Sequence, residues 1–381
     1  MSGRRTSGES TADEMTFREM NLRIFQGRPV PHVLFQPRME PWLHWHRIFD
    51  RLPPRYEGAS VTEFYDDLDC SMRYIHYYTD VPDPVVRRFT PRVTVYEQTG
   101  EDAKRIVYET PYGDLVEKQK LTVDDTWRTV GFPVRTLDDL KRLRWLCGEM
   151  TYHFVEENFR QGSDFIGERG EPQFWVPKSP YQALAQIWMK LEDLVYALAD
   201  DRDLVEEVMD AIDASYDPLY EEIVSSGRVR IVNFGENIHD QLISPRYWER
   251  YFIPFYEKRC AQLKKGGIYS HVHIDGYFCS LLPYLADLPF DGLEALTPEP
   301  QGDVALEEMA AAMGDKVLLD GIPAVMFMPQ YSRDELMEMT ERIVELFYPR
   351  LILGISDEVP EGTDVEAIER IRAIAAWCRD V

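Results

Sequence analysis

The stretch Gly266-Gly267-Ile268-Tyr269-Ser270-His271-Val272-His273-Ile274-Asp275-Gly276 indicates both the fold and the candidate chemistry of this chain. The paired glycines end a predicted helix, and the residues after them are typical of a strand. Because residues two apart in a strand share a face, His271, His273 and Asp275 should point the same way. Such a group suits a metal site or an acid/base cluster. If the strand belongs to a barrel, its carboxyl end is where chemistry is expected.

The chain changes character near Gln173, after which short apolar runs alternate with amphipathic helices. The predicted strands are 174–176, 229–234, 268–274, 292–296, 316–320 and 350–354. Repeated alternation of this kind means parallel strands with helical crossovers, which an open sheet and a barrel share.

Three details favour the barrel over the open sheet. The strand count comes close to eight if Val33 and the middle of the chain contribute, and no glycine-rich phosphate motif follows any strand. In addition, polar residues follow almost every strand: Arg38, Lys178, Glu236, Asp275, Glu294, Asp320 and Asp357. We therefore predict an α/β protein with a (β/α)8 TIM-barrel fold.

The first part of the chain predicts additions to this barrel. We expect helices over 11–25, 137–146 and 152–159, and a hairpin within 92–120 that turns at Thr99-Gly100-Glu101. A long helix is expected over 203–223. The prediction is a single domain over 15–381 with N-terminal helical and β-hairpin additions. The polar residues 1–14 are predicted to be a disordered tail.

Composition excludes several classes of protein. The 381 residues carry a net charge of −25, which disfavours nucleic acid or an anionic membrane as a partner and suits a neutral or cationic small molecule. No apolar run is long enough to cross a bilayer. The five cysteines form no CxxC pair, which excludes a cysteine zinc finger and indicates a reducing cytoplasm. The oligomeric state is left open.

Each candidate residue also has an ordinary structural interpretation. His271 and His273 could be satisfied core groups, although three titratable groups on one face are costly to bury unless they are paired or bind metal. Glu236-Asn237-Ile238-His239 could be a solvated loop or a carboxylate that orients a substrate. Asp320-Gly321 could be only a turn, and Ser356-Asp357 could be a helix cap.

At these residues the chain resembles the uroporphyrinogen decarboxylase superfamily, most clearly from about residue 170 onward. The superfamily includes porphyrin decarboxylases and zinc-dependent methyltransferases that take a methyl group from a corrinoid protein. The methyltransferase pattern is His-x-Cys-Gly, then Gly-Asn near a proline, then a cysteine shortly before a proline and a threonine. The corresponding segments here are His273-Ile274-Asp275-Gly276, Leu319-Asp320-Gly321-Ile322-Pro323 and Gly354 to Thr363, with matches also at Glu236-Asn237 and Leu242-Ile243-Ser244-Pro245.

The resemblance implies a barrel with its site at the carboxyl ends of the strands. It also implies a divalent metal, zinc in the family, held here by His273, Asp275 and Asp357, with His271 as a fourth ligand or a supporting partner. Both family cysteines are replaced, by Asp275 and by Asp357 (or Ser356). Carboxylates are harder ligands than thiolates and accept other divalent metals, and such a site still acts as a Lewis acid.

The same resemblance implies roles for the remaining site residues. Glu236, His239 and His271 are predicted to be catalytic, as acid/base or substrate-orienting groups. Arg38 is predicted to bind a substrate carboxylate, with Asn237 and Asp320 as further substrate-binding residues. The predicted reaction is methyl transfer between a small molecule and a corrinoid carried on a partner protein.

Two rival functions stay open. The first is a decarboxylase without metal, in which His271 and Asp275 would donate protons to a carbanion-like centre. The arginine-containing N-terminal motif of the decarboxylases is absent as such, and Phe35-Gln36-Pro37-Arg38 stands at about its place. The second rival is a binding protein that kept the barrel and lost the chemistry, because both family cysteines are missing.

Overall fold

The computed structural model describes residues 15–240 and 243–381, and its centre is a parallel sheet in the order β7-β8-β9-β10-β11-β12. The strands are β7 (Trp175–Val176), β8 (Ile231–Ile238), β9 (Tyr269–Ile274), β10 (Gly292–Glu294), β11 (Val317–Pro323) and β12 (Leu351–Ser356). Chain order equals spatial order, so each crossover moves to the next neighbour, as in a barrel. The predicted tail, residues 1–14, lies outside the described residues.

Two short extended segments close this sheet into a ring. Phe35 forms a parallel bridge with Leu353 of β12, and Tyr74 forms one with Gln173, just before β7. Between the two segments, the backbone N–H of Ser71 donates to the carbonyl oxygen of Phe35 at 3.0 Å. The predicted (β/α)8 barrel is confirmed, with the segments near residues 35 and 74 in the places of its first two strands.

Helices surround the barrel and one helix covers its base. In chain order the helical elements after the first are α2 (Glu40–Ile48), η1 (Pro54–Tyr56), α3 (Val61–Leu68), α4 (Leu137–Gly148), α5 (Glu156–Ile166), η2 (Gly167–Arg169), α6 (Pro180–Ala183), η3 (Leu184–Trp188), α7 (Leu191–Asp200), α8 (Arg202–Ser215), α9 (Asp217–Ser226), α10 (Pro245–Tyr247), η4 (Trp248–Phe252), α11 (Ile253–Lys265), η5 (Cys279–Asp287), α12 (Leu306–Ala312), η6 (Ala324–Phe327), α13 (Arg333–Phe347) and α14 (Val365–Asp380). The first helix, α1 (Phe17–Phe25), packs Met20 and Ile24 against Ile231 and Val317, the first residues of β8 and β11. The base of the barrel is therefore closed, and the opposite end carries the site.

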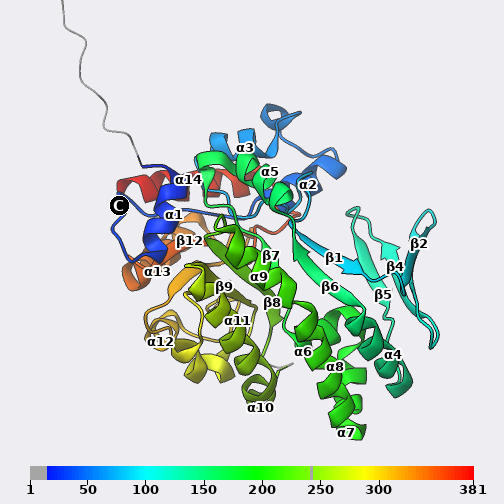
Figure 1. The fold of residues 1–381 in the computed structure, drawn as a ribbon. Helices are drawn as coiled ribbons and strands as arrows, with labels where there is room; N and C mark the ends of the chain where they lie inside the picture. The colour runs from blue at the N-terminus through cyan, green and yellow to red at the C-terminus, as the bar shows by residue number, and fades with distance from the viewer. Residues whose placement is uncertain (1–14, 241–242) are drawn as a thin grey trace, which may run out of the picture.

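The additions lie between the second barrel strand and β7. Strand β1 (Val85–Phe89) pairs antiparallel with β6 (Met150–Phe154), and β2 (Thr94–Thr99), β3 (Ala103–Glu109), β4 (Leu115–Leu121) and β5 (Trp127–Gly131) form a separate antiparallel sheet. The predicted hairpin is confirmed and extends to four strands. Figure 1 shows this sheet standing clear of the barrel.

Two predicted helices are wrong in their extent. Tyr152 to Phe154 belong to β6, because pairing with β1 overrides their helical spacing, and α5 begins only at Glu156. The long helix expected over 203–223 is two helices, α8 and α9. The break falls at Tyr216, just before Pro218, because a proline cannot donate the backbone hydrogen bond that would continue α8.

A tight contact in β12 makes one glycine essential to the barrel. A Cβ atom on Gly354 would come within 2.4 Å of Asp320 Oδ1 and 2.9 Å of the carbonyl oxygen of Gln36. We expect Gly354→Ala to lower the free energy of unfolding by about 1–3 kcal/mol, the usual cost of overpacking, in a urea titration.

Gly362→Ala is the matched control, because a Cβ there meets nothing within 4 Å. This change should shift the free energy of unfolding by less than about 0.5 kcal/mol. Equal effects of the two substitutions would contradict the packing account.

Candidate active site

A cavity of about 190 Å³ opens at the carboxyl ends of the barrel strands. Its lining residues come from six different barrel segments: Arg38, Tyr77, Trp175, Gly235, Glu236, Asn237, His273, Asp275 and Asp357. Six of the nine residues predicted for the site, Arg38, Glu236, Asn237, His273, Asp275 and Asp357, therefore meet in one place. They do so because parallel strands bring their carboxyl ends to the same edge of the barrel.

His273, Asp275 and Asp357 form a compact group at the floor of this cavity. His273 Nε2 lies 3.0 Å from Asp275 Oδ1 and 3.8 Å from Asp357 Oδ2. One potential ligand atom from each residue lies within 4.8 Å of the others. The second oxygen of Asp357, Oδ1, forms an ion pair with Arg38, whose side chain is buried. Arg38 thus orients Asp357 and leaves Oδ2 directed toward His273.

The other ring nitrogen of His273 is held by a buried carboxylate. Its Nδ1 lies 3.3 Å from Glu294 Oε2 at the end of β10. Burial disfavours the charged ring, but the hydrogen bonds to Asp275 and Glu294 outweigh this and raise the pKa of His273 to about 9. A carboxylate behind a histidine in this way fixes which nitrogen faces a bound metal ion.

Beneath the group lies a network of buried charges. Arg73 donates to Glu294 Oε1 at 2.5 Å and to Asp320 Oδ1 at 2.7 Å. Tyr74 and Asn233 also donate to Glu294. Burial alone would raise the pKa of Glu294, but Arg73 and the His273 hydrogen bond hold it well below its usual range. Glu294 is therefore an ionised support for His273.

Three predicted residues, His271, Asp320 and His239, do not line the cavity. His271 shares a face with His273, as expected, but lies below it, with Nε2 2.7 Å from Gln173 Oε1. Burial lowers the pKa of His271 to about 3, so its ring is neutral. Asp320 is fully buried and forms an ion pair with Arg73. The ring of His239 is half-buried and packs edge-on against Tyr277, with centroids 5.2 Å apart.

Glu236, on β8, also lines the cavity and is buried. Its Oε1 accepts from the backbone N–H of Ser179 at 2.6 Å. Burial raises the pKa of this carboxyl, and the nearby Lys178 ammonium partly opposes the shift. Lys178 itself donates to Asn237 Oδ1 at 2.9 Å. A buried carboxyl with a raised pKa beside a cavity suits proton transfer.

Several site residues were missed by sequence reasoning. Arg73 and Tyr74 support the floor, and Tyr77 and Trp175 form an aromatic wall, with ring centroids 5.2 Å apart. The segment Ser71-Met72-Arg73-Tyr74-Ile75 mixes polar and apolar residues, so it lacks the apolar run that marks the other barrel strands. The sequence signal that could have revealed these site residues is the group of three tyrosines after Arg73, at positions 74, 77 and 78.

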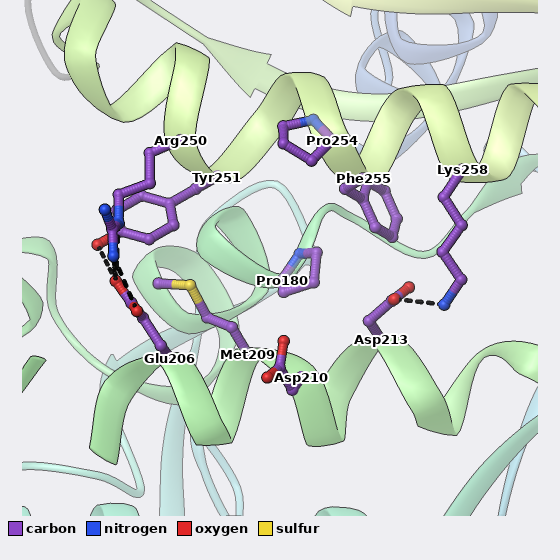
Figure 2. A pocket seen from close by; sticks show the side chains of 10 residues that line it. All are labelled: Pro180, Glu206, Met209, Asp210, Asp213, Arg250, Tyr251, Pro254, Phe255 and Lys258. Carbon is purple, nitrogen blue, oxygen red and sulfur yellow. Dashed lines mark hydrogen bonds and ion pairs between the residues drawn. The ribbon is translucent and has the colours of Figure 1, made fainter. Parts of the chain in front are cut away.

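A larger cavity, of about 430 Å³, lies outside the barrel between α8 and α11 (Figure 2). Its carboxylates are largely paired with cations: Glu206 with Arg250 at 2.8 Å, and Asp213 with Lys258 at 2.6 Å. Its lining residues come from helices rather than from strands, and it includes none of the predicted residues. The smaller cavity is therefore the candidate active site.

The donor set at the floor of the small cavity fits a divalent metal ion. One imidazole nitrogen and two carboxylates suit zinc, manganese or iron(II). The hydrogen bond that His273 donates to Glu294 and the ion pair between Arg38 and Asp357 supply the outer support that such ligands need. His273, Asp275 and Asp357 are the residues that would hold the ion.

The fold and the site define a barrel of the enzyme type, with its reactive groups at the carboxyl ends of the strands. The sequence profile described as uroporphyrinogen decarboxylase (URO-D) matches residues 178–376, more than half of the chain. The chain belongs to the URO-D family, as predicted. No sequence among the curated proteins matches it.

Solved structures share the fold. A methyltransferase from Methanosarcina mazei is 12% identical, with a TM-score of 0.60, and the alignment covers 96% of this chain and 99% of that chain. A B12-independent methionine synthase from a Shewanella species is also 12% identical, with a TM-score of 0.39, covering 69% and 74% of the two chains. The similarity to the methyltransferase is a similarity of fold. The TM-score for the methionine synthase is too low to support a conclusion.

The donor set generates a direct prediction about metal binding. We expect calorimetric titration with Zn²⁺ or Mn²⁺ to show a single tight site, and Asp357→Asn to weaken the affinity at least about tenfold, because one ligand is lost. Binding should also weaken as the pH falls, because the imidazole must lose its proton to bind an ion. Asp334→Asn, on the exposed start of α13, is the control. Equal affinity of the wild type and Asp357→Asn would contradict the assignment.

Proposed function

We propose that this protein is a metal-dependent methyltransferase that moves a methyl group between a corrinoid on a partner protein and a small molecule in the cavity. The observation that carries the proposal is the meeting of His273, Asp275 and Asp357 within 4.8 Å. These are the positions at which the chain resembles the methyltransferase pattern. The methyltransferase from Methanosarcina mazei that shares the fold also supports this branch of the family.

The size and charge of the cavity favour this function over porphyrin decarboxylation. A cavity of about 190 Å³ is too small for a tetrapyrrole, and Glu236, Asp275 and Asp357 would repel a substrate with many carboxylates. The same limit means that a corrinoid must approach the mouth from outside. Only the small-molecule substrate enters the cavity.

The proposed step balances as follows for transfer from the corrinoid. A lone pair of the acceptor X–H attacks the methyl carbon of methyl-cobalt(III), the carbon–cobalt bond breaks with its electron pair left on cobalt(I), and the X–CH₃ bond forms. The proton of X–H passes to a cavity carboxylate, for which Glu236 is the candidate. A bound divalent ion would act as a Lewis acid that eases loss of this proton.

The cavity residues have separate roles in this scheme. Arg38 holds Asp357 and contributes positive charge for an anionic part of the substrate. Asn237 offers its amide at the rim, and Trp175 and Tyr77 exclude water from one side. Glu294 and Arg73 position His273 from below.

A cytoplasmic location is part of the proposal. All five cysteines are free thiols and four are buried, which suits a reducing compartment. Among the described residues, no helix combines the length and the apolar character that a membrane crossing requires.

Methylcobalamin turnover tests the function. The purified protein is assayed with free methylcobalamin and a panel of small thiols, amines and phenols, while the cobalt(III)-to-cobalt(I) absorbance change is followed anaerobically. We expect turnover with at least one acceptor class when zinc, manganese or iron(II) is present. Chelation, or Asp357→Asn, should reduce the rate at least about 100-fold, because the transition state loses its electrostatic support.

Other outcomes of the same assay would support one of the two rival functions. Release of CO₂ from a carboxylated substrate by chelated protein would favour the decarboxylase. Ligand binding without any turnover, unchanged in His273→Ala, would favour a non-catalytic barrel. Either result would overturn the proposal.

The role of Glu236 is tested separately from that of the metal ligands. Glu236→Gln removes the proton acceptor but keeps the shape, so we expect kcat to fall by about 10²–10⁴-fold, the usual contribution of general acid–base catalysis. Metal affinity should stay unchanged, in contrast to Asp357→Asn. A Glu236→Gln enzyme of normal kcat would contradict the assignment.

A further inference from the structure

The outer face of the β2–β5 sheet carries an unusual group of cations. Arg105 of β3 lies directly opposite Lys118 of β4, and Lys120 of β4 lies directly opposite Arg128 of β5. All four side chains are exposed. Like charges opposite one another weaken a sheet, so this arrangement costs stability. These four residues form the basic face of the sheet.

Among the described residues, the ion pairs of the basic face involve Arg128 alone. Arg128 has an ion pair with Asp124 in the β4–β5 turn at 3.7 Å. Within the described part of the chain, no carboxylate lies within ion-pair distance of Lys118 or Lys120. A further cation, Arg135, lies beside Lys118, because both side chains would touch a Cβ atom placed on Gly131. In a chain of net charge −25, an exposed patch of positive charge marks a surface for an anionic partner.

One end of the basic face lies near the loop that follows Asp357. The charges of Asp124 and Arg128, at the β4–β5 turn, act on the carboxyl of Glu361 in that loop. In the same loop, Glu358 accepts a hydrogen bond from Tyr77, a wall residue, at 2.7 Å. A partner that contacts Arg128 would therefore lie beside the loop that flanks this wall of the cavity.

The size of the cavity explains why such a partner is needed. A corrinoid does not fit within about 190 Å³, so it must be held at the mouth by the protein that carries it. We propose that the basic face docks an acidic surface of this carrier protein, an inference that rests on the proposed function.

A folded protein fits this surface better than a nucleic acid does. The strong negative charge of the whole chain repels a long polyanion along its length, whereas a folded carrier presents carboxylates on one face. Tyr96 and Val130 are exposed on the same side of the sheet as Lys118 and give the contact apolar neighbours, as protein interfaces have.

The test is the double variant Lys118→Glu with Lys120→Glu. Each new carboxylate stands opposite Arg105 or Arg128, so the sheet should be as stable as the wild type or more so. Loss of function in this variant is therefore not a failure to fold. The control is Lys264→Glu with Lys265→Glu, which makes the same change of charge at the exposed end of α11.

The probes are free methylcobalamin, an acidic cobalamin-binding protein domain loaded with methylcobalamin, and a single-stranded oligothymidylate. With the loaded domain, we expect the double variant to raise KM at least about tenfold, and 0.5 M salt to weaken wild-type binding similarly. With free methylcobalamin, the wild type, the double variant and the control should turn over at equal rates.

Three results would overturn the inference. They are an unchanged KM for the loaded domain in the double variant, an equal loss with free methylcobalamin, and tighter binding of the oligothymidylate than of the domain. Binding of the domain is also measured by sedimentation without turnover. If the wild type fails to turn over free methylcobalamin, the proposed function fails, while charge-dependent binding of the domain still decides the docking surface.

Discussion

The structure depends on one buried cation, the guanidinium of Arg73, which lies between Glu294 and Asp320 in the middle of the barrel. Removing one partner of such a buried pair typically costs about 3–5 kcal/mol, because the other charge is left uncompensated. Through Glu294 this interaction reaches His273, and beside Asp320 it constrains β12 at Gly354. The floor of the cavity is therefore fixed before any ligand arrives.

This arrangement explains how carboxylates can stand where the family pattern has thiolates. Asp275 and Asp357 need compensating positive charge to lie near each other, and they receive it from His273 and Arg38. Burial raises the pKa of Asp275, but the hydrogen bond and the charge of His273 outweigh this and hold it below its usual value, so the carboxyl is ionised. A metal ion would replace the proton on His273 and give the same two carboxylates a stronger cation.

Much of this account could be predicted from the sequence, because strand–helix alternation and the His-x-His-x-Asp spacing are local signals. They indicated the barrel and the shared face of His271, His273 and Asp275, while the family resemblance added Asp357 to the group. How deeply each residue is buried depends on contacts with residues far away in sequence. His271 and Asp320 lie under the floor because Gln173 and Arg73 bind them there. The second barrel strand escaped prediction because Arg73, a charged residue, is buried only through its partners.

The central claim is that His273, Asp275 and Asp357 together hold a divalent ion. Anomalous diffraction from crystals grown with zinc or manganese, collected on both sides of the absorption edge of the metal, tests it most directly. The account predicts one strong anomalous peak within bonding distance of His273 Nε2 and of an oxygen from each carboxylate. A fully occupied peak elsewhere, or a crystal with no peak at this group at saturating metal, would contradict it.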